Sequence, residues 1–334
     1  MSDDAAAATA RAYRRFADEE VRGCSPLYED LARQVAGDRE ILDFLLTLPR
    51  EKRQPNLLLA ALRSLAGTPS GWPEFRRAVL SEGDRLREVM LARSTQTNEP
   101  GRCATLLPVL ARLPPPLALI EIGASAGLCL IPDRYGYDYG GRIVEPSVRR
   151  GDAPVFPCDA NAATPIPAAC PEIVWRAGLD LEPIDVRDPA ETAWLETLVW
   201  PEQTERLGRL RQSLAIAAGD PPRVIRGDLR RDLPALAREA PKDATMVIFH
   251  TAVLLYVGSA VERADFARLA TELCDFWIAN EPPGIVPQAA VPSQRPAAAW
   301  RYLVSVGGAA VAWSHPHGAA LEWIADPPRA SPRM

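Results

Sequence analysis

The sequence predicts an α/β protein in which a helical segment precedes a mostly parallel sheet. Three observations lead to this fold class. About ninety residues at the start carry apolar side chains at helical spacing and show no strand pattern. Short apolar runs then alternate with helical patterns, which indicates βαβ units and a sheet covered by helices. Near the end, Gly307 and Gly308 separate two apolar runs, so we expect a closing antiparallel hairpin.

The helical segment is expected to span residues 1–95. Its clearest start is Ser25 followed by Pro26, since serine caps a first turn and proline suits the first helical position. A long helix is predicted over residues 72–90. The polar residues 94–102 then break the helical pattern, and we interpret them as a linker that is also suited to facing a ligand.

The remaining residues, 96–334, are expected to form the α/β domain. Short continuous apolar runs are typical of parallel strands that are buried on both faces. We predict strands over residues 117–122, 173–177, 223–226, 245–249 and 276–279, helices over 190–198, 202–217, 233–240 and 261–273, and hairpin strands over 302–306 and 309–313. The distance between the first two strands indicates an insertion at about 136–170, which would include a hairpin from Tyr137 to Val144.

The composition argues against some kinds of binding partner and indicates a cellular compartment. Hydrophobic residues make up 47% of the chain, which excludes a disordered protein, and a net charge of −5 without a basic stripe argues against a nucleic-acid partner. The acidic start predicts no signal peptide, and the longest apolar stretch, residues 244–258, is too short for a membrane span. The six scattered cysteines form no C-x-x-C pair. We therefore expect no metal site and a cytoplasmic protein with reduced, mostly buried thiols.

The strongest local pattern is a buried strand that runs into a loop of glycines and small residues. Glu121 lies at the strand end, and Gly123, Ser125 and Gly127 follow at alternate positions. Glycines allow close approach of a ligand, and we expect a helix starting near Gly127 to offer it unpaired N–H groups. The spacing is not G-x-G-x-x-G, and the lysine of a P-loop is missing. Because Glu121 would repel a pyrophosphate, a zwitterionic or cationic ligand fits better, unless the loop is only a tight turn of the fold.

Three further strands end in ionisable residues. Asp180 is placed to accept both hydroxyls of a ribose, Asp228 to hold an exocyclic amine, and His250 follows the fourth strand. Each of them alone is equally well explained as a solvated strand end. Because the carboxyl ends of parallel strands meet at one edge of a sheet, we expect these residues and the glycine loop to share a ligand site.

These residues resemble the motifs of class I S-adenosylmethionine-dependent methyltransferases, over residues 97–324. The segment from Glu121 to Gly127 matches the first motif, Asp180 the second-strand acid and Asp228 the third-strand acid. The resemblance implies S-adenosylmethionine as the cofactor and a Rossmann-like seven-stranded sheet with strand order 3-2-1-4-5-7-6. It also implies that the glycine loop holds the methionine part, Asp180 the ribose and the region of Asp228 the adenine.

The match departs from the pattern of these methyltransferases at two points. Ser125 replaces the middle glycine, and Asp180 lies about 60 residues after Glu121, against about 20 in an ordinary Rossmann unit. Asp138 is a rival second acid because its spacing is closer to normal. More closely, the sequence resembles a bacterial family known as domain of unknown function 2332, through residues 96–103, 121–139, 175–189 and 222–236. That similarity spans nearly the whole chain and implies the same fold and cofactor, but no particular reaction.

We expect a methyltransferase that acts on a small molecule. His250 would serve as the base if the acceptor has a proton to lose, because histidine titrates near neutral pH. Asn98, Glu99 and Arg102 could close over the site, with Arg102 pairing a carboxylate, or they could cap the following helix. The helical segment would then form a lid that defines the substrate pocket.

Two other functions remain open. The first is a non-catalytic protein that binds S-adenosylmethionine or a nucleotide, which Ser125 and the spacing of Asp180 favour slightly, and the second is a protein methyltransferase. His315 and His317 are close enough in sequence to share a metal ion, but no third ligand is indicated. The tryptophans expected in the core are Trp300, Trp313 and Trp323. The sequence indicates no oligomeric state.

Overall fold

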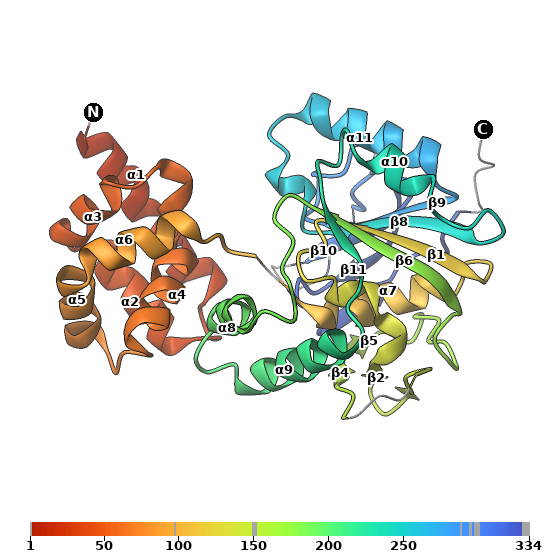
Figure 1. The fold of residues 1–334 in the computed structure, drawn as a ribbon, viewed down its shortest axis with the longest axis horizontal. Helices are drawn as coiled ribbons and strands as arrows, with labels where there is room; N and C mark the ends of the chain where they lie inside the picture. The colour runs from red at the N-terminus through yellow and green to blue at the C-terminus, as the bar shows by residue number, and fades with distance from the viewer. Residues whose placement is uncertain are drawn as a thin grey trace. The chain divides into compact units, whose positions relative to one another are not determined.

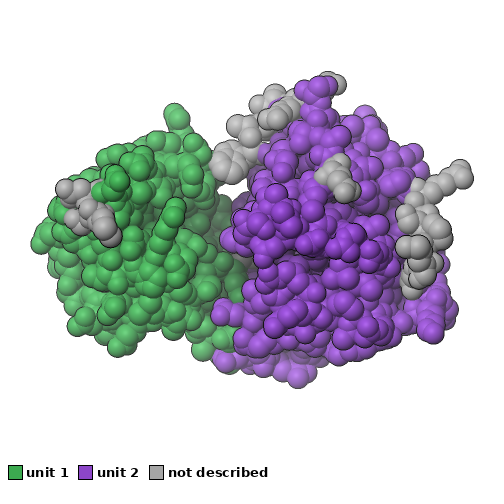
Figure 2. Space-filling view, turned by 90° about the horizontal axis from the view of Figure 1, so that it is seen from above, with its two compact units in different colours: residues 1–97, 189–208 green, residues 98–188, 209–334 purple. Residues whose placement is uncertain are grey.

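The computed structural model describes residues 2–96, 98–148, 152–287, 289–293, 296 and 301–328. The chain divides into two compact units, residues 1–97 with 189–208 and residues 98–188 with 209–334, which Figure 2 colours separately. None of the helices in the described ranges is long and apolar enough to cross a membrane.

The first unit is a bundle of helices (Figure 1). They are α1 (Ser2–Arg15), α2 (Pro26–Val35), α3 (Arg39–Leu46), α4 (Pro55–Ala66), α5 (Trp72–Ser81), α6 (Gly83–Ala92) and α8 (Pro189–Thr197). Ser25 accepts a hydrogen bond from the Tyr28 N–H and so caps α2, which confirms the predicted start. The prediction of a single helix over residues 72–90 is wrong. This segment forms two helices, α5 and α6, because the chain turns at Glu82 and Gly83, where glycine weakens a helix.

Helix α8 comes from the middle of the chain but completes the core of the first unit. Trp194 of α8 packs in the same apolar cluster as Tyr13 and Leu58, and its indole N–H donates to the carbonyl oxygen of Ser94. The sequence pattern placed this helix among the crossovers of the α/β part. A helical pattern alone does not show which core a helix joins, so this membership emerges only from the structure.

The second unit is organised around a nine-stranded mixed sheet of order β5-β12-β11-β10-β9-β8-β1-β6-β7 (Figure 1). The strands are β1 (Leu117–Ile122), β5 (Asp159–Ala160), β6 (Ile173–Asp180), β7 (Val224–Arg226), β8 (Thr245–Thr251), β9 (Phe276–Glu281), β10 (Tyr302–Val306), β11 (Ala309–Ser314) and β12 (Ala320–Trp323). Five neighbouring strands of the sheet, β7, β6, β1, β8 and β9, run parallel. From β9 to β12, neighbouring strands pair antiparallel.

The α/β fold is confirmed, but the strand order 3-2-1-4-5-7-6 is wrong. The sheet has nine strands, and β10 pairs directly with β9 instead of being separated from it by the last strand. An antiparallel neighbour needs no crossover, so the chain returns beside β9, and the turn at Gly307 and Gly308 then places β11 further out. The short strands β12 and β5, which leave little pattern in the sequence, extend this edge.

Helices cover the sheet, and one apolar cluster fixes its central strands. Ile120 of β1 and Ile248 of β8 pack with residues of α10 (Leu233–Ala237) and α11 (Ala260–Leu273). Figure 1 shows these two helices on one side of the sheet and α7 (Cys103–Leu110) on the other. Because neighbouring residues of a strand face opposite sides, Glu121 points away from this cluster.

Two further elements complete the unit. Helix α9 (Thr204–Gly219) begins among the residues of the first unit and ends among those of the second. A separate three-stranded sheet of order β3-β2-β4 forms the insertion after β1. Its strands β2 (Gly136–Asp138) and β3 (Ile143–Val144) pair antiparallel, which confirms the predicted hairpin, and β4 (Val155–Pro157) lies parallel to β2.

Candidate functional site

The glycine loop, residues 123–127, leads from β1 into two short 3₁₀ turns rather than into a helix. The turns are Leu128–Leu130 and Pro132–Arg134, so the expectation of a helix starting near Gly127 is wrong. Gly127 has a left-handed conformation with a φ of 70°, and Pro132 cannot donate the backbone hydrogen bond that a helix would need. The loop therefore does not end in a helix N-terminus that could attract an anion.

All five backbone N–H groups of the glycine loop donate hydrogen bonds inside the protein. The pairs are Gly123 and Ala124 with Leu179 O, Gly127 with Ala124 O, Ser125 with Asp180 Oδ2, and Ala126 with Asn98 Oδ1. A phosphate bound by such a loop needs several unpaired N–H donors. In this conformation the loop has none to offer, which argues against a pyrophosphate ligand.

The two outer glycines are required for space. A side-chain carbon on Gly123 would lie 2.5 Å from Cγ2 of Val253, and one on Gly127 would lie 2.6 Å from Cγ of Pro222. Both glycines also have positive φ values, 68° and 70°. The loop is therefore packed tightly between the segment that follows β8 and the segment that precedes β7.

Ser125 is tied to a second segment, which explains how it replaces the middle glycine. Its φ of 50° is uncommon for a residue other than glycine. The Asn98 side chain donates from Nδ2 to Ser125 Oγ at 2.6 Å and accepts from the Ala126 N–H at 2.9 Å. The serine hydroxyl thus makes a contact that a glycine would lack, and it fastens residues 98–102 to the loop.

The structure brings Asp180, and not Asp138, to the glycine loop. Oδ2 of Asp180 accepts from the Ser125 N–H and Oδ1 accepts from the Glu182 N–H, both at 2.8 Å. Asp138 instead accepts from the Gly141 N–H within its own hairpin. An ionised carboxylate has about four acceptor positions, so Asp180 keeps capacity for the hydroxyl groups of a ligand.

Glu121 is a buried carboxyl group without a hydrogen-bond partner among the described residues. Only 4% of the residue is exposed, and its Oε2 is fully enclosed. Burial raises the pKa of the Glu121 carboxyl well above its usual value, the nearby Cys129 raises it further, and the Arg102 guanidinium partly opposes this rise. Leaving such a group unpaired costs free energy. It is well suited to receive a hydrogen-bond donor or a cation that arrives from outside.

Arg102 is also buried, and its charge acts on Glu121. Its Nε donates to the carbonyl oxygen of Pro316 at 2.8 Å, and its Nη1 donates to both the carbonyl and the hydroxyl oxygen of Thr251 at 3.1 Å. Within the described part of the chain, Nη2 makes no hydrogen bond. Its two N–H groups are therefore available to a ligand with a carboxylate.

The structure bears on the contacts of residues 98–102. Glu99 Oε1 accepts from the Gly101 N–H at 3.1 Å and caps the short 3₁₀ helix Pro100–Arg102, as the capping interpretation predicts. Asn98 and Arg102, however, reach the glycine loop and the end of β8. The segment is thus fixed against the carboxyl ends of two neighbouring strands, β1 and β8.

His250 does not reach this cluster. It is completely buried in the apolar cluster on the other face of the sheet, between Phe266 and Trp277. Its Nδ1 lies 2.7 Å from Glu281 Oε1, and its Nε2 accepts from the indole N–H of Trp277 at 3.0 Å. Because both ring nitrogens are bonded and the ring is enclosed, we do not retain His250 as the base. Alternation along β8 sends this position to the same face as Ile248.

Asp228 is already neutralised by an arginine. Arg230 donates from Nε and Nη2 to the two carboxylate oxygens at 2.9 and 2.6 Å, and these bonds lower the pKa of Asp228 to about 2. Arg230 also forms an ion pair with Glu262. A ligand amine at Asp228 would compete with Arg230, so the structure does not offer Asp228 as an acceptor in the way it offers Glu121.

The two late histidines lie in a turn that contacts residues 98–102. Their ring centroids are 5.8 Å apart, and His317 Nδ1 lies 3.4 Å from Glu99 Oε2. Over the ranges that the structure describes, no three His, Cys, Asp or Glu side chains are grouped so that they could hold a metal ion. Trp313 and Trp323 are buried as predicted, whereas Trp300 lies outside the described residues.

Sequence reasoning missed two residues of this region, Thr251 and Glu281. Glu281 Oε1 accepts from the N–H groups of Val253 and Leu254 in addition to facing His250, and so it fixes the turn after β8. A charged residue that closes the apolar run 276–281 is the signal that could have revealed it. Thr251 gives no comparable signal.

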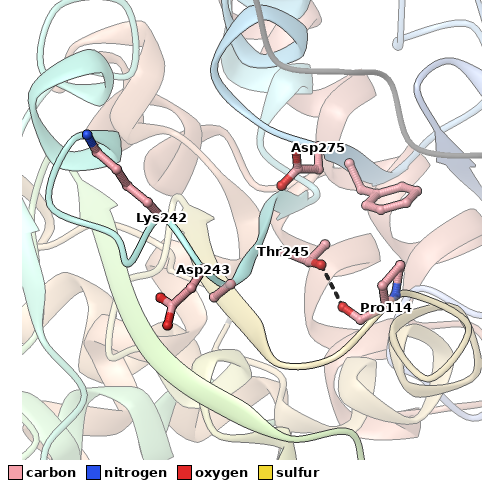
Figure 3. A pocket seen from close by; sticks show the side chains of 7 residues that line it. Pro114, Lys242, Asp243, Thr245 and Asp275 are labelled. Atoms are coloured by element: carbon pink, nitrogen blue, oxygen red, sulfur yellow. Dashed lines mark hydrogen bonds between the residues drawn. The ribbon is translucent and has the colours of Figure 1, made fainter.

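A hollow elsewhere in the second unit is separate from this cluster (Figure 3). It has a volume of about 400 Å³ and is lined by Pro114, Lys242, Asp243, Ala244, Thr245, Asp275 and Phe276. Thr245 and Phe276 are the first residues of β8 and β9, so the hollow lies at the amino ends of these strands. Ligands of open parallel sheets bind at the carboxyl ends, where the glycine loop lies.

Comparison with known proteins yields one finding. The family model described as "Uncharacterized protein conserved in bacteria (DUF2332)" matches residues 10–323. No curated protein and no solved structure gives a significant match. The matched residues include the glycine loop, residues 98–102 and both late histidines. The chain therefore belongs to this bacterial family, as the sequence resemblance predicted.

Proposed function

We propose that the protein is an S-adenosylmethionine-dependent methyltransferase with a Rossmann-like fold and a small-molecule acceptor. The observation that carries this proposal is the buried, unpaired carboxyl group of Glu121 beside a glycine loop at the carboxyl end of β1. The α-ammonium group of the methionine part would pair with this carboxyl, because a nearby cation favours its ionised form. The parallel strands, which run third, second, first, fourth and fifth in chain order, support the fold assignment.

The surrounding residues suit the other parts of the ligand. Arg102 would bind the methionine carboxylate through Nη2, since guanidinium and carboxylate groups form strong charge-assisted hydrogen bonds. Asp180 would accept from the ribose hydroxyls. Asp228 would hold the adenine amino group only after Arg230 gives up one of its bonds, so we assign it the weakest contact.

When bound, S-adenosylmethionine supplies an electrophilic methyl group on a sulfonium ion. The residues of this chain then have to position an acceptor in line with the carbon–sulfur bond, because orientation is the main contribution that such a displacement needs. Gly123 and Gly127 let the loop pack closely against Val253 and Pro222, which fixes the strand ends. The hydrogen bond between Asn98 and Ser125 holds the segment that carries Arg102 beside the glycine loop.

A non-catalytic binding protein with the same site is the second candidate. It is favoured by the occupied N–H groups of the glycine loop and by the Arg230 pair at Asp228, both of which reduce the contacts left for the ligand. The two functions differ in turnover. Incubation with labelled S-adenosylmethionine and a broad panel of small acceptors would give methylated product for the enzyme and none for the binding protein.

Calorimetric titration with S-adenosylmethionine and S-adenosylhomocysteine tests the shared site. We expect both ligands to bind, and Asp180→Asn to weaken binding by about tenfold or more, since a lost hydrogen bond to a charged group is worth roughly 1.5–3 kcal/mol. Asp138→Asn is the matched control and is expected to bind like the unmodified protein. Absence of binding by either ligand would exclude the proposed function, and equal losses in the two variants would reverse the choice of the second acid.

A further inference from the structure

We propose that Arg301 binds an anionic oxygen group, such as a carboxylate, of the methyl acceptor. The proposal rests on the proposed function and takes it further, because it gives the acceptor a charge. Arg301 is the residue before β10, and it is half-buried. Its Nε is fully enclosed and has no hydrogen-bond partner among the described residues. A buried donor without a partner costs free energy, and a ligand that accepts from it removes this cost.

The positive charge of Arg301 is not balanced within the described part of the chain, where no hydrogen bond or ion pair involves its guanidinium group. Burial raises the pKa of the Cys158 thiol to about 12, Asp159 adds to this rise, and Arg301 opposes it. Arg301 and Asp159 thus act on the same thiol without forming an ion pair with each other. A planar guanidinium group in this state is well suited to bind a carboxylate or a phosphate from outside.

The strand pairing places Arg301 at the same edge of the sheet as Glu121. Strand β10 runs antiparallel to β9, and Leu303 pairs with Glu281, the last residue of β9. Residue 301 therefore lies just beyond the carboxyl end of β9, and the parallel strands β1 and β8 end at this same edge. Strand β10 is three strands away from β1 in the sheet order, or about 14 Å at the usual spacing of neighbouring strands.

Arg301 also lies on the side of the sheet to which Glu121 points, the side that α7 covers (Figure 1). The link is the Cys158 thiol on which Arg301 acts. Burial raises the pKa of Tyr139, and the nearby Cys158 raises it further. The Tyr139 hydroxyl donates to the carbonyl oxygen of Ala104 in α7 at 2.7 Å, so Cys158 and Arg301 belong to this side.

The surroundings of Arg301 are packed against the segment that carries Arg102. The Asp159 N–H donates to the carbonyl oxygen of Ala319 at 2.9 Å, and the neighbouring Gly318 has no room for a side chain beside the carbonyl group of Gly101. The two arginines can therefore serve one site with different tasks. Arg102 would bind the carboxylate of the cofactor, and Arg301 would bind and orient an acceptor that carries an anionic group.

Nuclear magnetic resonance of the arginine side chains tests the site directly. Arg301→Lys identifies the Nε–H signal of Arg301 in spectra of ¹⁵N-labelled protein, because the signal is lost in this variant. At constant ionic strength we expect acetate or phosphate to move the signal in a saturable way, whereas the neutral acetamide leaves it in place. Arg112, which lies before β1 at the opposite edge and pairs with Asp326, provides the control signal. It should need at least about tenfold more of either anion.

Methyl transfer provides the second measurement. With labelled S-adenosylmethionine, small hydroxy and amino acids should be methylated at least about tenfold faster than their amides. Arg301→Gln should remove this preference by raising the KM of the acids, and it should bind S-adenosylhomocysteine within about threefold of the unmodified protein. Arg112→Gln is the matched control and should change neither property.

Three results would overturn the assignment. The first is an Arg301 signal that neither anion moves, or that responds no more strongly than the signal of Arg112. The second is equal methylation of acids and amides by the unmodified protein. The third is a loss of tenfold or more in S-adenosylhomocysteine binding by Arg301→Gln, which would assign Arg301 to the cofactor. Absence of S-adenosylhomocysteine binding by the unmodified protein would instead remove the proposed function, whereas the response of Arg301 to the two anions would still be measured.

Discussion

Two buried glutamates near the ends of strands in the same sheet have opposite surroundings. Glu281 ends β9, and its Oε1 faces three donors, which are His250 Nδ1 and the N–H groups of Val253 and Leu254. Glu121, near the end of β1, has no hydrogen-bond partner among the described residues, whereas Glu281 leaves only its second oxygen, the buried Oε2, without one. Burial of a carboxyl group alone therefore does not identify a site. The fold accounts for the position of Glu281 but not for that of Glu121, and we infer that Glu121 is kept for a ligand.

The largest expected effect is on stability, at Glu281. Glu281→Leu leaves the donors of His250, Val253 and Leu254 unpaired in the core, and removal of one partner from a buried pair costs about 3–5 kcal/mol. Urea denaturation measures this loss in the free energy of unfolding. Glu239→Gln, which breaks an exposed ion pair with Arg223, is the control and should change the free energy of unfolding far less. Similar losses in the two variants would show that the Glu281 contacts do not support the fold.

Glu121→Gln should separate binding from stability. The amide cannot balance a ligand ammonium group, so we expect affinity for S-adenosylhomocysteine to fall by about tenfold or more, or at least roughly 1.4 kcal/mol. The ligand-free variant should be as stable as the unmodified protein or more stable, because it no longer buries an unpaired ionisable group. Calorimetry and urea denaturation measure the two properties. A variant that binds normally but unfolds more easily would show that Glu121, like Glu281, supports the fold and does not serve a ligand.

The stability of the ligand-free protein should depend on pH through Glu121. Burial raises the pKa of this carboxyl well above its usual value of 4.5, so the folded protein holds a proton that the unfolded chain releases. The free energy of unfolding must then fall as the pH rises from about 4.5 through the raised pKa. Glu121→Gln lacks this titration, so its stability relative to the unmodified protein should increase with pH over that range. Urea denaturation of both proteins at several pH values measures the difference, and a constant difference would contradict the assigned burial.

The smallest expected effect concerns the hydrogen bonds between the Asn98 side chain and the glycine loop at Ser125, which we call the clamp. Asn98→Ala removes both side-chain bonds to the glycine loop, and Ser125→Gly removes one of them while restoring a residue that tolerates positive φ. We expect each variant to weaken S-adenosylhomocysteine binding only a fewfold, with a coupling of about 0.5–1.5 kcal/mol in the double-mutant cycle. Strictly additive effects would show that the clamp does not act as a unit.

The sequence predicts the parallel part of the fold well, since buried strands such as residues 117–122 appear as continuous apolar runs. It fails for the antiparallel edge, because the hairpin at Gly307 and Gly308 shows which two strands pair but not which of them joins β9. It also predicts a helix after Gly127, because the sequence does not reveal that the loop closes on itself and continues into 3₁₀ turns.

In the candidate site, too, local sequence patterns predict some residues, whereas contacts between distant segments are not predicted. Glu121, Asp180 and the glycines follow from the position of a strand end, which an apolar run reveals. His250 also lies near the end of a strand, but its face of the sheet depends on the register of β8, which sends it into the core. The pair of Glu99 and His317 joins residues far apart in the chain, and no local pattern announces such a contact.

The central claim is that Glu121, whose pKa is raised by burial, pairs with a cationic group of the ligand and releases a proton as it does so. Calorimetric titration with S-adenosylhomocysteine at mildly acidic pH, in two buffers with different ionisation enthalpies, measures the protons released on binding. We predict a clear release by the unmodified protein and none by Glu121→Gln. No release by the unmodified protein, or the same release by both proteins, would contradict the account.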